Sequence, residues 1–467
     1  MTLPAGLTPR SEDLAPREIA LVDLTRRCRT ELDGGLDELG LAAVLESWGI
    51  TDSTARTRFG ERDVFALAVE VGARVDGDAH RVRRPAPRRP WIRWSWVLRA
   101  AAYVPPALFV VIALSSSANV ASGAVFAAIT CFGWGMAEAL SRVAYTAINA
   151  GGLAAVRNLN RSLLGWGSLV IVVLAVITGL LTGSVPAALL VGAQLQYLLL
   201  SVVLLPMERA GALVVWISPA MVLATALAAG AGDLGSVLVV AIVCELGATV
   251  HTWLVLGRVG SADFGAARWS DLRTSLPYLG SGIAMGAFVL CCTAAVYAAL
   301  GSGQALIGLV IPLLVSMGLA EIGLRWFQRA VAVQLGRSAR VAEFAGRARI
   351  LVVLSCCGYL AVLLSADLLM VAFADPQALS DRPADYVLVA LVGLSLFLTL
   401  VLMVMDHVFA VLAAFSVGTL VLGWYLVTFH APDDVVVPAV VVAAIVTIYL
   451  AAVALRTVGH PANHAFA

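Results

Sequence analysis

Apolar runs of about 20 residues recur along this chain from residue 95 onward, and short polar stretches separate them. A helix of that length crosses the hydrocarbon core of a bilayer. The whole chain is 60% apolar and only 13% charged, whereas about a quarter of the residues in soluble domains are charged. This composition excludes an ordinary soluble protein, and it predicts an all-α polytopic membrane protein.

The distribution of arginine tests how many of these runs cross the membrane. Basic residues are retained on the cytoplasmic side of a membrane. With the N-terminus inside, nearly every arginine beyond Arg99 falls on that side, and only Arg382 lies outside. We therefore predict a multi-pass protein of the bacterial plasma membrane with both termini in the cytoplasm. The twelve predicted transmembrane helices cover residues 95–116, 120–140, 163–183, 186–206, 212–230, 234–255, 278–300, 304–325, 350–374, 386–405, 407–428 and 436–456.

The N-terminal part differs in composition from the rest of the chain. Residues 1–80 are rich in arginine and acids and carry short helical patterns, which predict a small cytoplasmic helical domain. Residues 81–94 form a basic, proline-rich linker that ends in tryptophans, a pattern typical of a segment held at anionic lipid headgroups. Membrane lipids are therefore the predicted partners of the linker.

Within this domain, the segment WGITDSTARTRFGERDVFALA (residues 48–68) resembles the helix-turn-helix of TetR-type regulators. Gly49, Ile50, Thr51, Thr54, Phe59 and Gly60 match its spacing. The resemblance implies contact with duplex DNA, but Arg56 replaces the usual aromatic residue and Asp52 adds a negative charge that phosphates would repel. We predict a helical packing unit that binds a cytoplasmic protein partner rather than nucleic acid.

One charged octapeptide occurs twice. GMAEALSR (residues 135–142) ends the second predicted span, and GLAEIGLR (residues 318–325) ends the eighth. The shared pattern G-x-A-E-x-x-x-R lies at the same place in two successive sets of six spans. The sequence therefore predicts two six-helix pseudo-repeats, residues 95–276 and 277–467, which is a recurring design of transporters.

Twelve spans, six-plus-six halves, and long inner loops after spans two and eight resemble the MOP superfamily, which includes MATE exporters, the lipid II flippase and polysaccharide flippases. The glycine-to-arginine ends of spans two and eight are similar to those of the polysaccharide branch. This resemblance covers residues 95–456. It implies alternating access and a substrate made of a polyprenyl tail, a pyrophosphate and an oligosaccharide.

Arginine is the residue type that would recognise the phosphates of such a lipid-linked glycan, because its guanidinium offers a planar fork of donors. The arginines nearest the inner mouth of the expected cavity are Arg99, Arg142, Arg325 and Arg329. The alternative is that they only reach for lipid headgroups at helix ends.

Acidic residues inside spans are costly and mark ion pathways or ion pairs. Glu138 and Glu321 each lie four residues before an arginine, so we expect structural ion pairs with Arg142 and Arg325. Glu245 and His251, near the end of span six, add groups that could couple transport to an ion. Asp406 and His407 are expected to form the tight turn between spans ten and eleven.

Other functional classes remain open from the sequence. A MATE-like or major-facilitator exporter of small molecules shares the twelve spans, and a membrane scaffold or regulator could use the N-terminal domain. The sequence carries no nucleophile elbow, P-loop or HExxH pattern, so we predict no catalytic residues, and the cysteine spacing indicates no metal site or cofactor.

Overall fold

The computed structural model describes residues 16–31, 38–76, 94–105, 109, 120–228, 233–257, 269–300, 303–335, 341–374, 383–428 and 435–459. The chain divides into two units. One contains Met1–Trp91, Gln328–Leu351 and Val458–Ala467, and the other, called the bundle here, contains Ile92–Phe327 and Val352–Thr457.

The described part of the N-terminal helical domain has five helical elements and a core of its own. The helices are α1 (Pro16–Glu31), α2 (Glu38–Ser47), the short pair α3 (Asp52–Thr54) and η2 (Ala55–Phe59), and α4 (Val64–Asp76). Their apolar faces meet in one cluster that includes Leu21, Leu45 and Phe59. Gly49 and Gly60 adopt φ values of 80° and 71° at the turns on either side of α3 and η2, a conformation that glycine enters without strain.

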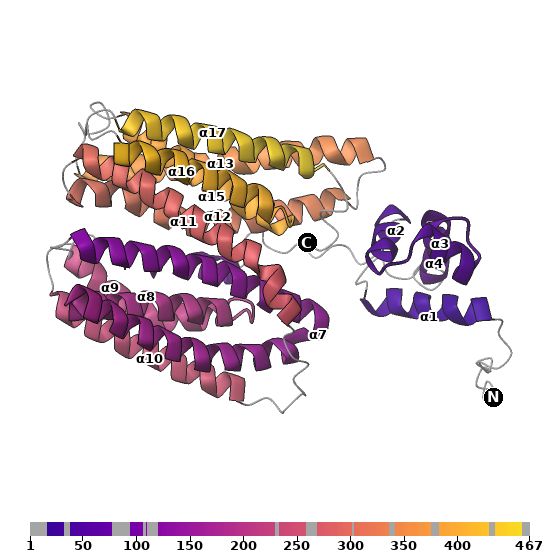
Figure 1. The fold of residues 1–467 in the computed structure, drawn as a ribbon. Coiled ribbons are helices and arrows are strands. Elements are labelled where there is room, and N and C mark those ends of the chain that lie inside the picture. The colour runs from indigo at the N-terminus through magenta and orange to yellow at the C-terminus, as the bar shows by residue number, and fades with distance from the viewer. Residues whose placement is uncertain are drawn as a thin grey trace. The chain divides into compact units, whose positions relative to one another are not determined.

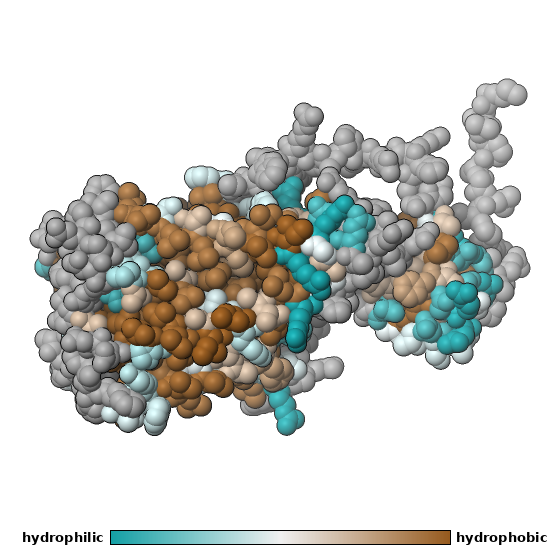
Figure 2. All heavy atoms as spheres, turned by 90° about the horizontal axis from the view of Figure 1, so that it is seen from above, coloured by the Kyte–Doolittle hydropathy of each residue, from teal (hydrophilic) through white to brown (hydrophobic). Residues whose placement is uncertain are grey.

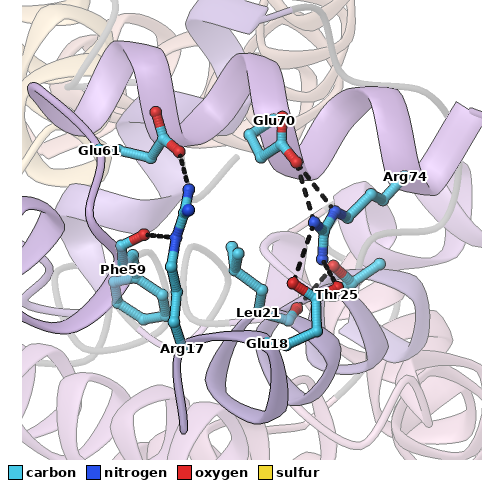
Figure 3. Close-up of polar contacts among 8 residues, drawn as sticks. All are labelled: Arg17, Glu18, Leu21, Thr25, Phe59, Glu61, Glu70 and Arg74. Carbon is cyan, nitrogen blue, oxygen red and sulfur yellow. Dashed lines mark hydrogen bonds and ion pairs between the residues drawn. The ribbon is translucent and has the colours of Figure 1, made fainter. Parts of the chain in front are cut away.

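Ion pairs fasten α1 to the rest of this domain. Arg74 of α4 contacts Glu18 of α1 at 2.8 Å and Glu70 at 3.0 Å, and Arg17 contacts Glu61 at 2.6 Å (Figure 3). Asp52 accepts a hydrogen bond from the backbone N–H of Val64 at 3.0 Å. Asp52, the acid that departs from the TetR-type pattern, therefore binds the first backbone N–H of α4. The resemblance to TetR-type regulators stays a prediction.

The bundle is entirely helical in its described residues. The predicted first half contains α5, α7, α8, α9 and α10, and the predicted second half contains α11, α12, α13, α15, α16 and α17. Figure 1 shows most of these helices, and the parts of α12 after Phe327 and of α13 before Val352 belong to the other unit. The bounds of the helices are α5 (Trp94–Ala101), α7 (Val120–Thr182), α8 (Val185–Leu204), α9 (Ala210–Ala228), α10 (Leu234–Gly257), α11 (Trp269–Leu300), α12 (Gly303–Leu335), α13 (Val341–Ala374), α15 (Pro383–Val404), α16 (Val408–Thr428) and α17 (Val436–Thr457). Helices thus cover most of each predicted span from residue 120 onward, and residues 229–230 of the span 212–230 lie outside the described residues.

Helix α7 bends back on itself and supplies two arms of the first half. A Cβ on Gly133 would lie 2.7 Å from a methyl group of Leu195, and one on Gly167 would lie 2.8 Å from a methyl group of Leu199. Both glycines therefore contact the same stretch of α8, although a straight helix would place them roughly 50 Å apart. The two purple arms can be followed in Figure 1.

Apolar side chains cover much of the bundle surface. Figure 2 shows a broad hydrophobic face, and exposed residues such as Leu180, Val215 and Leu420 are 70% to 80% accessible. Within the described residues, eight helices are long and apolar enough to cross a membrane. They are Leu159–Thr182, Val185–Leu204, Leu234–Gly257, Arg273–Ala299, Glu343–Leu369, Pro383–Val404, Val408–Thr428 and Val436–Thr457. The chain is a multi-pass membrane protein. The count of twelve spans and the two six-helix pseudo-repeats stay predictions, because eight spans are clear and much of residues 95–116 lies outside the described residues.

Candidate functional site

The two copies of the octapeptide lie where the halves of the bundle touch. Gly135 of α7 faces α11, and a Cβ on it would lie 2.5 Å from the carbonyl oxygen of Leu279. Gly318 of α12 faces α5, and a Cβ on it would lie 2.3 Å from the carbonyl oxygen of Ala100. Only glycine permits backbones to approach this closely. Each copy therefore places its glycine in direct contact with a helix of the other half.

Arg99 of α5 and Glu321 of α12 form an ion pair across this contact. Arg99 Nε lies 3.3 Å from Glu321 Oε1, and the two side chains are only 12% and 8% exposed. Arg99 also donates hydrogen bonds to the carbonyl oxygen of Leu205 at 3.1 Å and to the Tyr145 hydroxyl at 3.0 Å. One guanidinium thus joins four helical segments of the bundle.

Glu321 holds a second arginine from its own helix. Arg325 Nε donates to Glu321 Oε1 at 3.1 Å, which is the expected i,i+4 pair. The Glu321 carboxylate therefore lies between two guanidinium groups, one from α5 and one from α12. The acid of the second octapeptide is therefore shared by both halves.

The arginine of the first octapeptide has a different partner. Arg142 lies 3.3 Å from Asp406, in the turn between α15 and α16, and its guanidinium lies 5.2 Å from the ring centroid of Tyr278. The Tyr278 hydroxyl donates a hydrogen bond to the same Asp406 carboxylate. The Arg142 and Asp406 side chains are 43% and 62% exposed, and a pair of that exposure contributes about 1 kcal/mol or less.

The expected pair between Glu138 and Arg142 is therefore wrong. Both side chains are described, and no ion pair joins Glu138 to any described residue. The i,i+4 spacing makes the local pair available, but Asp406 and Tyr278 together offer Arg142 a carboxylate and an aromatic face. The tertiary partners prevail over the local one.

Two turns at this end of the bundle share one unusual backbone conformation. Glu208, between α8 and α9, has φ 58°, and Asp406, between α15 and α16, has φ 63°. In each turn, the backbone N–H of the residue after the acid donates to the carbonyl oxygen five residues before it. The donors are Arg209 and His407, the acceptors are Leu204 and Leu402, and both distances are 3.0 Å. This is the Schellman ending of a helix, where the left-handed position usually holds glycine. An acid occupies it in both halves.

The turn formed by Asp406 and His407 was expected from the sequence, and the structure confirms it. Its contact with Arg142 was not expected, and neither was the role of Tyr278 or the equivalent position of Glu208. Their only signal in the sequence is an acid at the same place, between the fourth and fifth predicted spans and between the tenth and eleventh.

The other predicted site residues lie apart from this cluster. Glu245 of α10 is 4% exposed, and its Oε1 has no hydrogen-bond partner among the described residues. His251 lies beside Trp216 with ring centroids 6.2 Å apart, and no contact given by the structure joins it to Glu245. Arg329 is exposed on the part of α12 that groups with the other unit, so it is not placed with the cluster.

We call the end of the bundle that carries these groups the charged end. Its members are Arg99, Glu138, Arg142, Tyr145, Glu208, Tyr278, Glu321, Arg325 and Asp406. Guanidinium groups bind phosphate as readily as carboxylate, so an anionic ligand could bind here by displacing Glu321 or Asp406. The described residues contain no group of three or more side chains suited to hold a metal ion.

Solved transporter structures resemble this architecture. The outward-facing conformation of a multidrug resistance MATE family transporter of the MOP superfamily matches with a TM-score of 0.51 and 16% identity, over 78% of this chain and 93% of that one. A MATE structure in the straight conformation matches with a TM-score of 0.48, 15% identity and coverage of 78% and 94%. A MOP superfamily transporter from Pyrococcus furiosus matches with a TM-score of 0.44, 14% identity and coverage of 80% and 100%.

No protein-family model matches the sequence, and the search of curated proteins finds no match either. The likeness therefore concerns the fold and not the substrate. The chain is a multi-pass membrane protein whose architecture is similar to that of the MOP superfamily and MATE transporters.

Proposed function

We propose that this protein is an alternating-access transporter that moves a polyprenyl-diphosphate-linked oligosaccharide across the plasma membrane for synthesis of a cell-surface polysaccharide. In this proposal the charged end faces the cytoplasm, and the substrate enters between the two halves. The MOP-type fold supports a transporter, and the charge distribution of the sequence supports the orientation.

The observation that carries the substrate class is the gathering of Arg99, Arg142 and Arg325 at one end of the interface between the halves. A diphosphate offers several oxygens to planar guanidinium forks. Each of these arginines contacts a carboxylate in the structure, and in this proposal the phosphate oxygens of the substrate replace that carboxylate. Arg329 groups with the other unit. Its role as a further phosphate contact stays a prediction.

The experiment compares lipid-linked glycan in a deletion strain with that in strains that express variants. Deletion should cause the lipid-linked oligosaccharide to accumulate and the amount of surface glycan to fall. The variant Arg142→Ala, Arg325→Ala should reproduce this defect at normal protein level. Arg347→Ala is the matched control, since Arg347 pairs with Glu343 on an exposed helical surface. Normal surface glycan in the deletion strain, with no accumulated precursor, would exclude the proposal.

A MATE-like exporter of small molecules is the second candidate, because the first structure described above is a multidrug resistance transporter. The same deletion strain separates the two functions. An exporter predicts greater sensitivity to toxic organic compounds with unchanged surface glycan.

A further inference from the structure

We propose that the arginine of each octapeptide moves between two carboxylates, and that the two movements together open and close a gate at the charged end. One carboxylate is the glutamate four residues earlier in the same helix, called the home acid here. The other is the acid in the left-handed position of a turn in the opposite half, called the turn acid. The home and turn acids are Glu138 and Asp406 for Arg142, and Glu321 and Glu208 for Arg325. The inference rests on the proposed alternating-access function.

The two turn acids occupy equivalent positions. Glu208 and Asp406 both have positive φ, and the N–H groups of both turns make the same pair of backbone hydrogen bonds. The backbone N–H of Glu208 donates to the carbonyl oxygen of Leu205, and the N–H of Asp406 donates to that of Met403, both at 3.1 Å. Each turn follows the fourth predicted span of its half.

The two arginines are observed in different positions. Arg142 makes no ion pair with its home acid Glu138 and contacts the turn acid Asp406 at 3.3 Å. Arg325 forms an ion pair with its home acid Glu321 at 3.1 Å. Its turn acid, Glu208, is exposed and has no ion pair among the described residues. One structure thus contains both positions of the same sequence module.

The residue beside each close glycine contact explains the difference. Arg99 directly precedes Ala100, which touches Gly318, and Tyr278 directly precedes Leu279, which touches Gly135. Arg99 therefore gives the home acid Glu321 a second cation. Tyr278 instead binds the turn acid Asp406 and lies under Arg142, so it favours the opposite position.

Arg325 is connected to the turn that carries Glu208 through Glu321 and Arg99. Arg99 donates to the carbonyl oxygen of Leu205, three residues before Glu208, and also contacts the Glu321 carboxylate that holds Arg325. One carboxylate and one guanidinium therefore connect Arg325 to this turn. Glu321 is only 8% exposed, but Arg99 stays beside it when Arg325 leaves, so this carboxylate keeps a cation in both positions.

The test measures hydrogen–deuterium exchange of backbone amides at residues 204–209 in the purified full-length protein, by mass spectrometry. Glu321→Gln removes the home acid, so Arg325 should move to Glu208 and slow exchange at this turn by at least about twofold. The double variant Glu321→Gln, Glu208→Gln should lose the slowing. A purely structural role for Glu321 predicts faster exchange, since its loss leaves Arg99 without a carboxylate.

Glu208→Gln alone keeps the test decisive if Glu321→Gln fails to fold. This variant should speed exchange at residues 204–209, and the further change Arg325→Gln should add nothing. Glu343→Gln, in an exposed pair on another helix, is the control. Unchanged exchange in Glu208→Gln, or additive effects of the two changes, would overturn the gate. The readout needs no substrate, so failure of the glycan assay would refute the proposed substrate without refuting this exchange.

Discussion

Gly135 of α7 and Gly282 of α11 bring the two halves of the bundle into direct backbone contact. A Cβ on Gly282 would lie 2.6 Å from the Cα of Gly135 and 2.9 Å from its nitrogen. Neither atom is the end of a flexible side chain, so neither can move aside cheaply. This contact fixes how closely the first octapeptide approaches the second half.

Gly282→Ala should therefore separate α7 from α11 and lower the stability of the bundle. Overpacking of this kind costs about 1–3 kcal/mol. The measurement is the midpoint of thermal unfolding of the purified protein, followed by tryptophan fluorescence. Gly358→Ala is the matched control, because a Cβ on this helical glycine would meet nothing within 4 Å. Its midpoint should be unchanged or higher, since alanine favours a helix more than glycine does.

Arg99→Ala should destabilise the bundle more than any exposed arginine substitution. It leaves Glu321, which is 8% exposed, with only one cation, and it removes the side-chain hydrogen bond to the Leu205 carbonyl. Breaking a buried pair costs on the order of 3 kcal/mol. Arg99→Lys should recover only part of the loss, because an ammonium lacks the fork that reaches three partners. Thermal unfolding checks both variants, and equal midpoints for Arg99→Ala and Arg347→Ala would contradict the assignment.

Asn160→Asp should weaken the packing of α7 on α8. The Asn160 side chain is fully buried, and its Nδ2 donates to the carbonyl oxygen of Val203 at 3.0 Å. A carboxylate offers no hydrogen to this carbonyl unless it is protonated, so the substitution should cost about 1–3 kcal/mol. Ser365→Ala removes an exposed hydroxyl bonded only to its own helix, and should shift the unfolding midpoint little. The comparison isolates the contact between the helices.

The N-terminal helical domain should lose stability in acid through Asp63. A backbone hydrogen bond from Ala66 holds the pKa of this carboxyl below its ordinary value of 3.8. The folded state therefore binds the proton more weakly than the unfolded state does. The stabilisation is present above pH 3.8 and is lost as pH falls through the folded-state pKa.

Circular dichroism of residues 1–80 during acid titration measures this effect, since the domain has a core of its own. Asp63→Asn keeps a capping oxygen and should remove the pH dependence that this residue contributes. Asp23→Asn, a change of another acid in the same domain, is the control. If both variants follow the wild-type titration, the capping role of Asp63 is refuted.

Apolar run length was enough to predict the helices, because span length is set by the bilayer and not by tertiary contacts. The repeated octapeptide was also visible, but its glycines could not be assigned a contact from spacing alone. Arg142 shows why the ion pairs were harder. A local rule offered Glu138, and the choice of Asp406 depends on a turn 264 residues away. The pair between Arg325 and Glu321 was predictable because the partner lies one turn away in the same helix.

Positive φ at Glu208 and Asp406 has a practical consequence for protein engineering. Glycine at either position would relieve backbone strain, so a screen for thermostabilised variants is expected to select it. Such a variant would be more robust in detergent while lacking a carboxylate at the charged end. If the proposed gate operates, a preparation stabilised in this way would keep its fold but lose transport, so these two turns should keep their acids when the chain is stabilised.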